Sequence, residues 1–146
     1  MVDVVSDIII ARSPRATFAY VSNPDNAPEW YVNIKAVEWK SAPPARIGSR
    51  IAFVAQFLGR QLAYTYEIVE LVRNERLVMR TAEGPFPMET TYTCAPAING
   101  HTRMTLRNRG VPSGFSRLLA PFMSRAMRSA NRKDLALLKV ILERKP

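Results

Sequence analysis

The stretch IIIARSPRATF, residues 8–18, passes from a β-branched run directly into a helix start. Residues 4–11 have the composition of a short strand, Ser13 is a helix-capping residue type, and Pro14 suits the first helical position. Phe18 and Val21 fall on one face of a helix over residues 14–21, which ends at the turn formers of residues 22–26. The sequence therefore predicts a strand followed at once by a helix, with a second helical turn at residues 28–31 anchored by Trp30.

After residue 33 the pattern changes to short strands separated by turns. Strand-like runs cover residues 34–40, 49–58, 61–72, 77–81, 86–95 and 101–109. Asn99 and Gly100 predict a type I′ hairpin, because this pair readily adopts the two positive φ angles of that turn. Successive hairpins indicate an antiparallel meander, and alternation places Glu67 and Arg103 on its outer face.

Residues 113–145 are predicted to form one amphipathic helix. Ser113 can cap it, and Pro121 should kink or restart it about two turns in. At about 100° per residue, an apolar stripe contains Phe115, Leu119, Phe122, Ala126, Ala130, Leu137, Val140 and Ile141, whereas Arg117, Arg125, Arg128, Arg132 and Lys139 lie nearly opposite. Lys133 falls inside the apolar stripe, where it either snorkels at the edge of the helix or meets an acidic group of a ligand.

This order of elements predicts a single α+β domain over residues 1–146. Its expected core is a curved seven-stranded antiparallel sheet wrapped around a long C-terminal helix (β-α-α-β6-α). The length of 146 residues and the hydrophobic fraction of 47% suffice for one core. No apolar run approaches the ~18 residues of a membrane span and the N-terminus has no signal-peptide pattern, so a cytoplasmic location is expected.

The net charge of +9 is concentrated in the last third of the chain. Residues 1–100 carry ten basic and ten acidic residues, whereas residues 101–146 carry eleven basic and two acidic ones. The basic helix face has three interpretations: a solvated surface, a contact with anionic membranes, or a contact with RNA. The candidate anion-contacting residues are Arg117, Arg125, Arg128 and Arg132, and no aromatic residue is interleaved with them for base recognition.

Catalytic and metal-binding motifs are missing from the sequence. It contains no His-Glu-x-x-His, paired cysteine, phosphate-loop or nucleophile-elbow pattern, so neither a metal nor another cofactor is expected. The single histidine, His101, follows the predicted hairpin turn and should lie in water. The single cysteine, Cys94, excludes an internal disulfide and is interpreted as an inert core residue.

Three segments carry a resemblance to a known family. These are residues 8–14 leading into Phe18, Asn23-Pro24 through Pro28-Glu29-Trp30, and Asp134-Leu135 through Leu138 to Leu142-Glu143. With the order of elements, they resemble the START/Bet v 1-like (SRPBCC) superfamily and, within it, the polyketide cyclase/dehydrase-like group. The resemblance implies a helix-grip fold, in which a cavity between the concave sheet and the C-terminal helix holds a hydrophobic ligand.

The predicted inner faces carry aromatic and thioether side chains that suit such a cavity, although the same pattern is typical of a packed core. The leading hypothesis is binding or transport of a hydrophobic small molecule, such as a lipid, a polyketide or an isoprenoid. A polyketide cyclase or dehydratase with Tyr64, Tyr66 or Tyr92 as the acid is the alternative. The candidate ligand-binding residues are Trp30, Phe53, Tyr64, Tyr66, Phe86, Met88, Tyr92, Met104, Leu119, Phe122, Met123 and Met127.

Overall fold

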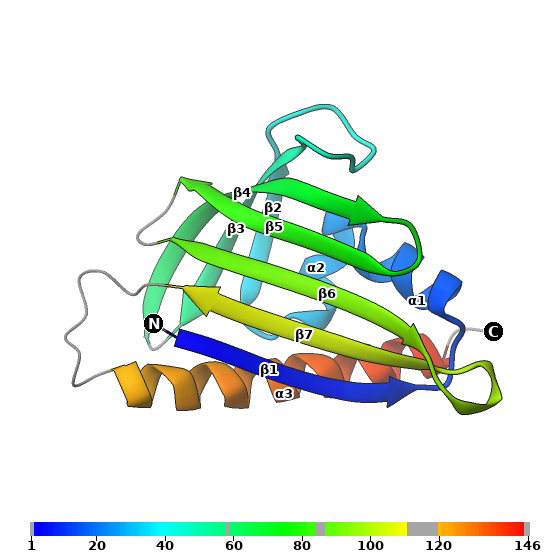
Figure 1. Cartoon of the computed structure of the whole chain (residues 1–146). Coiled ribbons are helices and arrows are strands. Elements are labelled where there is room, and N and C mark those ends of the chain that lie inside the picture. The colour runs from blue at the N-terminus through cyan, green and yellow to red at the C-terminus, as the bar shows by residue number, and fades with distance from the viewer. Residues whose placement is uncertain (1, 58, 84–86, 111–119, 145–146) are drawn as a thin grey trace.

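A seven-stranded antiparallel sheet organises the computed structural model, which describes residues 2–57, 59–83, 87–110 and 120–144 (Figure 1). The strands follow the order β1-β7-β6-β5-β4-β3-β2, which confirms the meander predicted from the turns. The last strand, β7, also pairs with the first strand, β1. The elements are β1 (Val2–Ile10), α1 (Pro14–Val21), a 3-10 turn (Pro24–Asn26), α2 (Ala27–Trp30), β2 (Ile34–Trp39), β3 (Arg50–Phe57), β4 (Arg60–Val72), β5 (Arg76–Glu83), β6 (Met88–Pro96), a second 3-10 turn (Ile98–Gly100), β7 (Thr102–Gly110) and α3 (Ala120–Arg144).

The junction between β1 and α1 forms as its residue types predict. The Ser13 side chain accepts a hydrogen bond from the Ala16 amide at 3.1 Å, and Pro14 opens the helix. The C-terminal end of α3 forms two hydrogen bonds to this junction. The Ala11 amide donates to Glu143 Oε2 at 2.8 Å, and the Lys139 ammonium donates to the Ile9 carbonyl at 2.9 Å. The stretch 8–18 therefore anchors both the sheet and the long helix.

Register irregularities and turns shape the sheet. The β4–β5 register shifts twice, between Thr65 and Tyr66 and between Ile68 and Glu70, and such bulges increase the twist and bend of a sheet. The turn between β6 and β7 has positive φ at Asn99 (60°) and Gly100 (74°), which confirms the predicted hairpin. The result is the expected helix-grip arrangement, in which α3 runs along the β1 edge of the sheet (Figure 1).

The buried face of α3 differs from the predicted apolar stripe. The residues it buries are Met123, Met127, Asn131, Asp134, Leu135, Leu138 and Leu142. Phe122, Leu137 and Val140, which the prediction placed inside, are exposed by 57%, 36% and 43%. The predicted buried face was wrong because it is rotated about the helix axis from the observed one. Two polar residues, Asn131 and Asp134, belong to the observed buried face, and a face chosen from apolar residues alone excludes them.

The corrected rotation also resolves the unusual position of Lys133. This lysine is exposed on the outer face of α3, so it neither snorkels from an apolar stripe nor reaches an internal ligand. The described part of the helix begins at Ala120, and Pro121 is its second residue. The predicted start at Ser113, together with Phe115 and Leu119, lies outside the described residues.

Two packed clusters fill the space between sheet and helices. The larger one joins α1, α2 and the C-terminal half of α3 to the sheet and includes Trp30, Ile68, Met104 and Leu138. The smaller one joins Val2, Val4, Leu62, Tyr64, Met123 and Met127 at the other end of α3. None of the helices in the described part of the chain is long and apolar enough to cross a membrane.

Candidate functional site: a cavity between the sheet and helix α3

A cavity of about 140 Å³ lies between the two clusters. Its walls come from α3, from the segment after α2 and from the inner faces of β2 to β7. The described residues that line it are Tyr31, Asn33, Ile34, Phe53, Ala55, Leu62, Tyr64, Tyr66, Met79, Met88, Thr90, Tyr92, Asn108, Met123, Met127, Ala130, Asn131 and Asp134. An apolar cavity of about 150 Å³ accommodates benzene, so this space of about 140 Å³ is on the scale of one aromatic ring.

Seven of the twelve ligand-binding candidates named from the sequence lie on the cavity wall. They are Phe53, Tyr64, Tyr66, Met88, Tyr92, Met123 and Met127. They converge because they occupy alternate positions of β3, β4 and β6 and successive turns of α3, so one face of each element turns inward.

Three candidates lie elsewhere. Trp30 is fully buried in the larger cluster, where its ring packs against Tyr31 at 4.1 Å and Tyr92 at 5.5 Å between centroids. Met104 is fully buried beside Cys94, with 3.8 Å between their sulfur atoms. Phe122 points outward, and Phe86 and Leu119 lie outside the described residues.

Polar residues of the cavity were missed by the sequence analysis. Thr90 lies between Met88 and Tyr92 in the alternation of β6, and Asn108 follows Leu106 by two positions in β7. Asn131 follows Met127 by one helical turn, and Asp134 follows Asn131 by nearly another. The same periodicities that located the apolar lining could have found all four, but polar side chains were assigned to the solvated faces.

A hydrogen-bonded chain crosses the cavity wall from the sheet to the helix. The Thr90 hydroxyl donates to Asn108 Oδ1 at 2.6 Å, and Asn108 Nδ2 donates to Asn131 Oδ1 at 3.1 Å. Asn131 Nδ2 is buried and has no acceptor among the described residues. An amide donor without a partner is costly inside a protein, so this end of the chain is suited to an added acceptor.

The polar end of the cavity is formed by Tyr31, Tyr66, Tyr92 and Asp134. The Tyr31 and Tyr92 hydroxyls lie 2.7 Å apart in a hydrogen bond. Asp134 Oδ1 accepts the Val32 amide proton at 2.8 Å, which holds the segment after α2 against α3. Met123, Met127, Leu62 and Tyr64 form the apolar end, in the smaller cluster.

Burial changes the acid–base properties of this polar end. It raises the pKa of Asp134 from 3.8 to about 6, against the opposing effect of the Val32 hydrogen bond. Burial also raises the pKa of Tyr66 to about 12 and the pKa values of Tyr31 and Tyr92 above their usual range. At neutral pH the site therefore holds one carboxylate among neutral phenols.

Other candidate groups lie away from the cavity. Burial raises the pKa of the Cys94 thiol to about 12, so this cysteine is a poor nucleophile. His101 is partly buried next to the β6–β7 turn, whereas open water was expected, and it does not line the cavity. In the described part of the chain, no three His, Cys, Asp or Glu side chains lie close enough to hold a metal ion.

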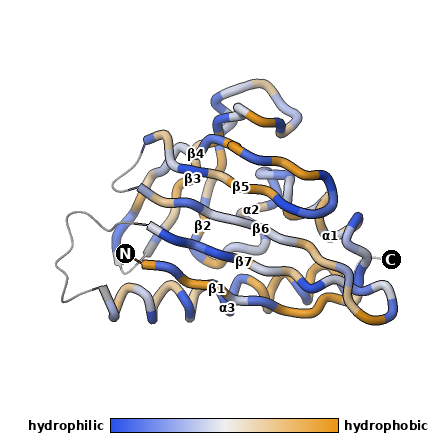
Figure 2. The backbone as a smooth tube through the Cα atoms, in the orientation of Figure 1, coloured by the Kyte–Doolittle hydropathy of each residue, from blue (hydrophilic) through white to orange (hydrophobic). Residues whose placement is uncertain are grey.

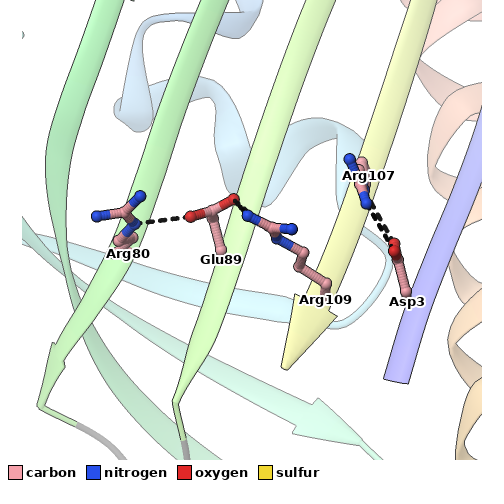
Figure 3. Close-up of polar contacts among 5 residues, drawn as sticks. All are labelled: Asp3, Arg80, Glu89, Arg107 and Arg109. Atoms are coloured by element: carbon pink, nitrogen blue, oxygen red, sulfur yellow. Dashed lines mark hydrogen bonds and ion pairs between the residues drawn. The ribbon is translucent and has the colours of Figure 1, made fainter. Parts of the chain in front are cut away.

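The basic residues of β7 are neutralised on the outer face of the sheet (Figure 3). Glu89 pairs with Arg80 at 2.6 Å and with Arg109 at 2.9 Å, and Asp3 pairs with Arg107 at 2.6 Å. Because these acids come from residues 1–100, the balanced part of the chain cancels much of the charge of β7, whose end nearest residue 110 is strongly hydrophilic (Figure 2).

Three arginines of α3, Arg125, Arg128 and Arg132, form an exposed basic group. They project from the outer face of the helix and make no ion pair within the described residues. Arg117 lies outside the described residues. These three arginines therefore place part of the positive charge seen in the sequence on one helix face, opposite the cavity.

A family model described as "Polyketide cyclase / dehydrase and lipid transport" matches residues 1–143. No curated protein shows significant sequence similarity to the chain. Among solved structures, a protein from Thermus thermophilus superposes with a TM-score of 0.82 at 20% identity, covering 96% of each chain.

Two further solved structures share the fold. A START superfamily protein from Mycobacterium smegmatis has a TM-score of 0.80 at 13% identity and covers 97% of each chain. An aromatase/cyclase from Streptomyces sp. R1128 has a TM-score of 0.80 at 13% identity, covering 97% of this chain and 93% of that one. At these identities the similarity extends to the architecture alone.

Proposed function

The chain belongs to the polyketide cyclase/dehydrase and lipid transport family, and from this membership and its cavity we propose that it binds and carries a hydrophobic small molecule. The ligand occupies the space between the sheet and α3. One observation carries the proposal: aromatic, aliphatic and thioether side chains from α3 and from five strands converge on one internal space that packing leaves open. Protein interiors are normally close-packed, so an open space of this kind is suited to binding a ligand.

The lining favours a carrier over a catalyst. Most of the wall is apolar, and its tyrosines have pKa values raised by burial, which makes them weak proton donors near neutral pH. Tyr64, Tyr66 and Tyr92 therefore act in this proposal as hydrogen-bonding and stacking surfaces. Met88, Met123 and Met127 supply flexible side chains that adapt to the shape of the ligand.

Filling the cavity tests the proposal directly. Ala55 faces the cavity from β3, so Ala55→Phe places a ring in the space that the ligand needs. Ala52 lies on the opposite face of the same strand, which makes Ala52→Phe a matched control. Calorimetric titration with 2-phenylethanol should show binding to the wild type and to Ala52→Phe, with at least about tenfold weaker binding to Ala55→Phe.

Native mass spectrometry of freshly purified protein provides an independent readout, because a carried ligand adds its own mass. Equal binding of 2-phenylethanol by the wild type and Ala55→Phe would contradict the proposed site. A wild type that binds no apolar probe and carries no added mass would contradict the proposed function.

A cyclase or dehydratase is the second candidate function, and one observation favours it. Asp134 has a pKa of about 6 and faces the Tyr31–Tyr92 pair, so a base and hydrogen-bond donors lie at one end of an apolar cavity. Proton removal next to a carbonyl requires this combination. Turnover of a poly-β-ketone model substrate should then disappear in Asp134→Asn. If turnover persists in the Tyr64→Phe, Tyr66→Phe and Tyr92→Phe variants, these tyrosines are rejected as the acids.

A further inference from the structure

The described lining of the cavity contains one acidic residue and no basic residue. Of the eighteen side chains on its wall, Asp134 is the one carboxylic acid, and there is no lysine, arginine or histidine. Asp134 is 3% exposed and its carboxylate forms no ion pair in the described part of the chain. Removing a carboxylate from water is costly unless a positive charge or several hydrogen bonds compensate for it.

Only one of the two oxygens of this carboxylate forms a hydrogen bond with a described residue. Oδ1 accepts the Val32 amide proton, whereas Oδ2 has no hydrogen-bond partner among the described residues. Oδ2 nevertheless keeps some accessible surface, unlike the fully buried side-chain nitrogen of Asn131. Because Asp134 lines the cavity and is otherwise buried, that access is from the cavity side.

Aromatic rings surround the same end. Tyr31, Tyr66 and Tyr92 are close enough to Asp134 or to one another to influence each other electrostatically. A carboxylate oxygen and tyrosine hydroxyl oxygens therefore lie together at one end of an apolar space.

We propose that the bound molecule carries a protonated amine, which pairs with the free oxygen of Asp134 while its ring or chain occupies the apolar end. This inference rests on the proposed function and names its ligand class: a small hydrophobic amine. The amine supplies the positive charge that the buried carboxylate lacks. A fatty-acid carboxylate would instead place two negative charges at the same end, which strongly disfavours it.

Three one-ring probes that differ in their polar head test this assignment. 2-Phenylethylamine, 2-phenylethanol and phenylacetate are titrated calorimetrically into the full chain at pH 7.5. The amine should bind at least about tenfold more tightly than the alcohol, and phenylacetate should bind most weakly, because a hydrogen-bonded charge pair contributes more than a neutral hydrogen bond.

Asp134→Asn is the decisive variant, because an asparagine side chain can still accept the Val32 amide proton. Binding of the amine should fall to the level of the alcohol, whereas binding of the alcohol should stay within about twofold. The preference for the amine should also shrink between pH 7 and pH 5, as Asp134 gains a proton. The other titratable groups that face it, Tyr31, Tyr66 and Tyr92, stay neutral over this range.

The outcomes separate this inference from the function on which it rests. An alcohol that binds as tightly as the amine, or an Asp134→Asn variant that loses both probes equally, would overturn the amine assignment and leave the carrier function standing. Failure of all three probes to bind the wild type would overturn both.

Discussion

Replacing Asp134 by asparagine should make the protein more stable at neutral pH. The folded state holds this carboxyl group at a pKa of about 6, compared with 3.8 in an unfolded chain. At 1.36 kcal/mol for each pH unit of difference, keeping the buried group ionised costs the folded state about 3 kcal/mol above pH 6. Asparagine has nearly the same shape, keeps an acceptor for the Val32 amide and removes that cost.

The direction of the pH dependence follows from proton binding. Between about pH 4 and pH 6 the folded state binds more protons at Asp134 than the unfolded state does, so its contribution to stability falls as pH rises through this window. The free energy of unfolding of Asp134→Asn, relative to wild type, should therefore increase from pH 4 to pH 7. The gain at pH 7 should approach about 3 kcal/mol.

Urea unfolding of both proteins at pH 4.5, 5.5, 6.5 and 7.5 measures this difference. Carboxylates whose pKa values are lowered, such as Asp3 and Glu89, affect both proteins alike and cancel in the comparison. A constant difference across the series, or a variant less stable than wild type at pH 7.5, would refute the reasoning.

Three further predictions concern packing, polar contacts and the helix surface. Leu138→Ala should lower the free energy of unfolding by about 2–5 kcal/mol in urea titrations, whereas Leu137→Ala should change it by less than about 0.5 kcal/mol, and similar losses would contradict the observed rotation of α3. Asn108→Ala leaves Thr90 and Asn131 without their shared partner and should cost about 1–3 kcal/mol, which thermal unfolding can measure; an unchanged midpoint would show that the chain of hydrogen bonds contributes nothing. Anionic vesicles should co-sediment the protein at low salt and release it as the salt concentration rises, and a variant with Arg125, Arg128 and Arg132 changed to glutamine should stay in the supernatant. No binding of the wild type at low salt would reject this surface.

Local signals in the sequence predicted most of the fold. The transition from β-branched residues to Ser13-Pro14 and the Asn99-Gly100 turn depend on the backbone preferences of neighbouring residues, which act in any tertiary context. The meander followed from these turns, because short connections force adjacent strands to pair. These features needed no information about distant contacts.

The cavity was predictable only in part. Alternation correctly turned Phe53, Tyr64 and Tyr92 inward, since strand geometry fixes the face on which each side chain lies. Trp30 lies in the core because of how α2 docks beside Tyr92, and a single sequence does not give that docking angle. Asn131 and Asp134 were missed because hydrophobic patterning assumes that polar residues face water, which fails where a buried face includes polar residues.

The pairing of β1 with β7 has a consequence for how the chain folds during synthesis. Val2 lies opposite Gly110 and Ile10 lies opposite Thr102, so the first strand to emerge from a ribosome must wait for the last strand before it can enter the sheet. At about 5–20 residues per second, that delay lasts roughly 5–20 s. During this interval β1 lacks the strand that satisfies its backbone hydrogen bonds, and faster elongation shortens the time for which this edge stays open.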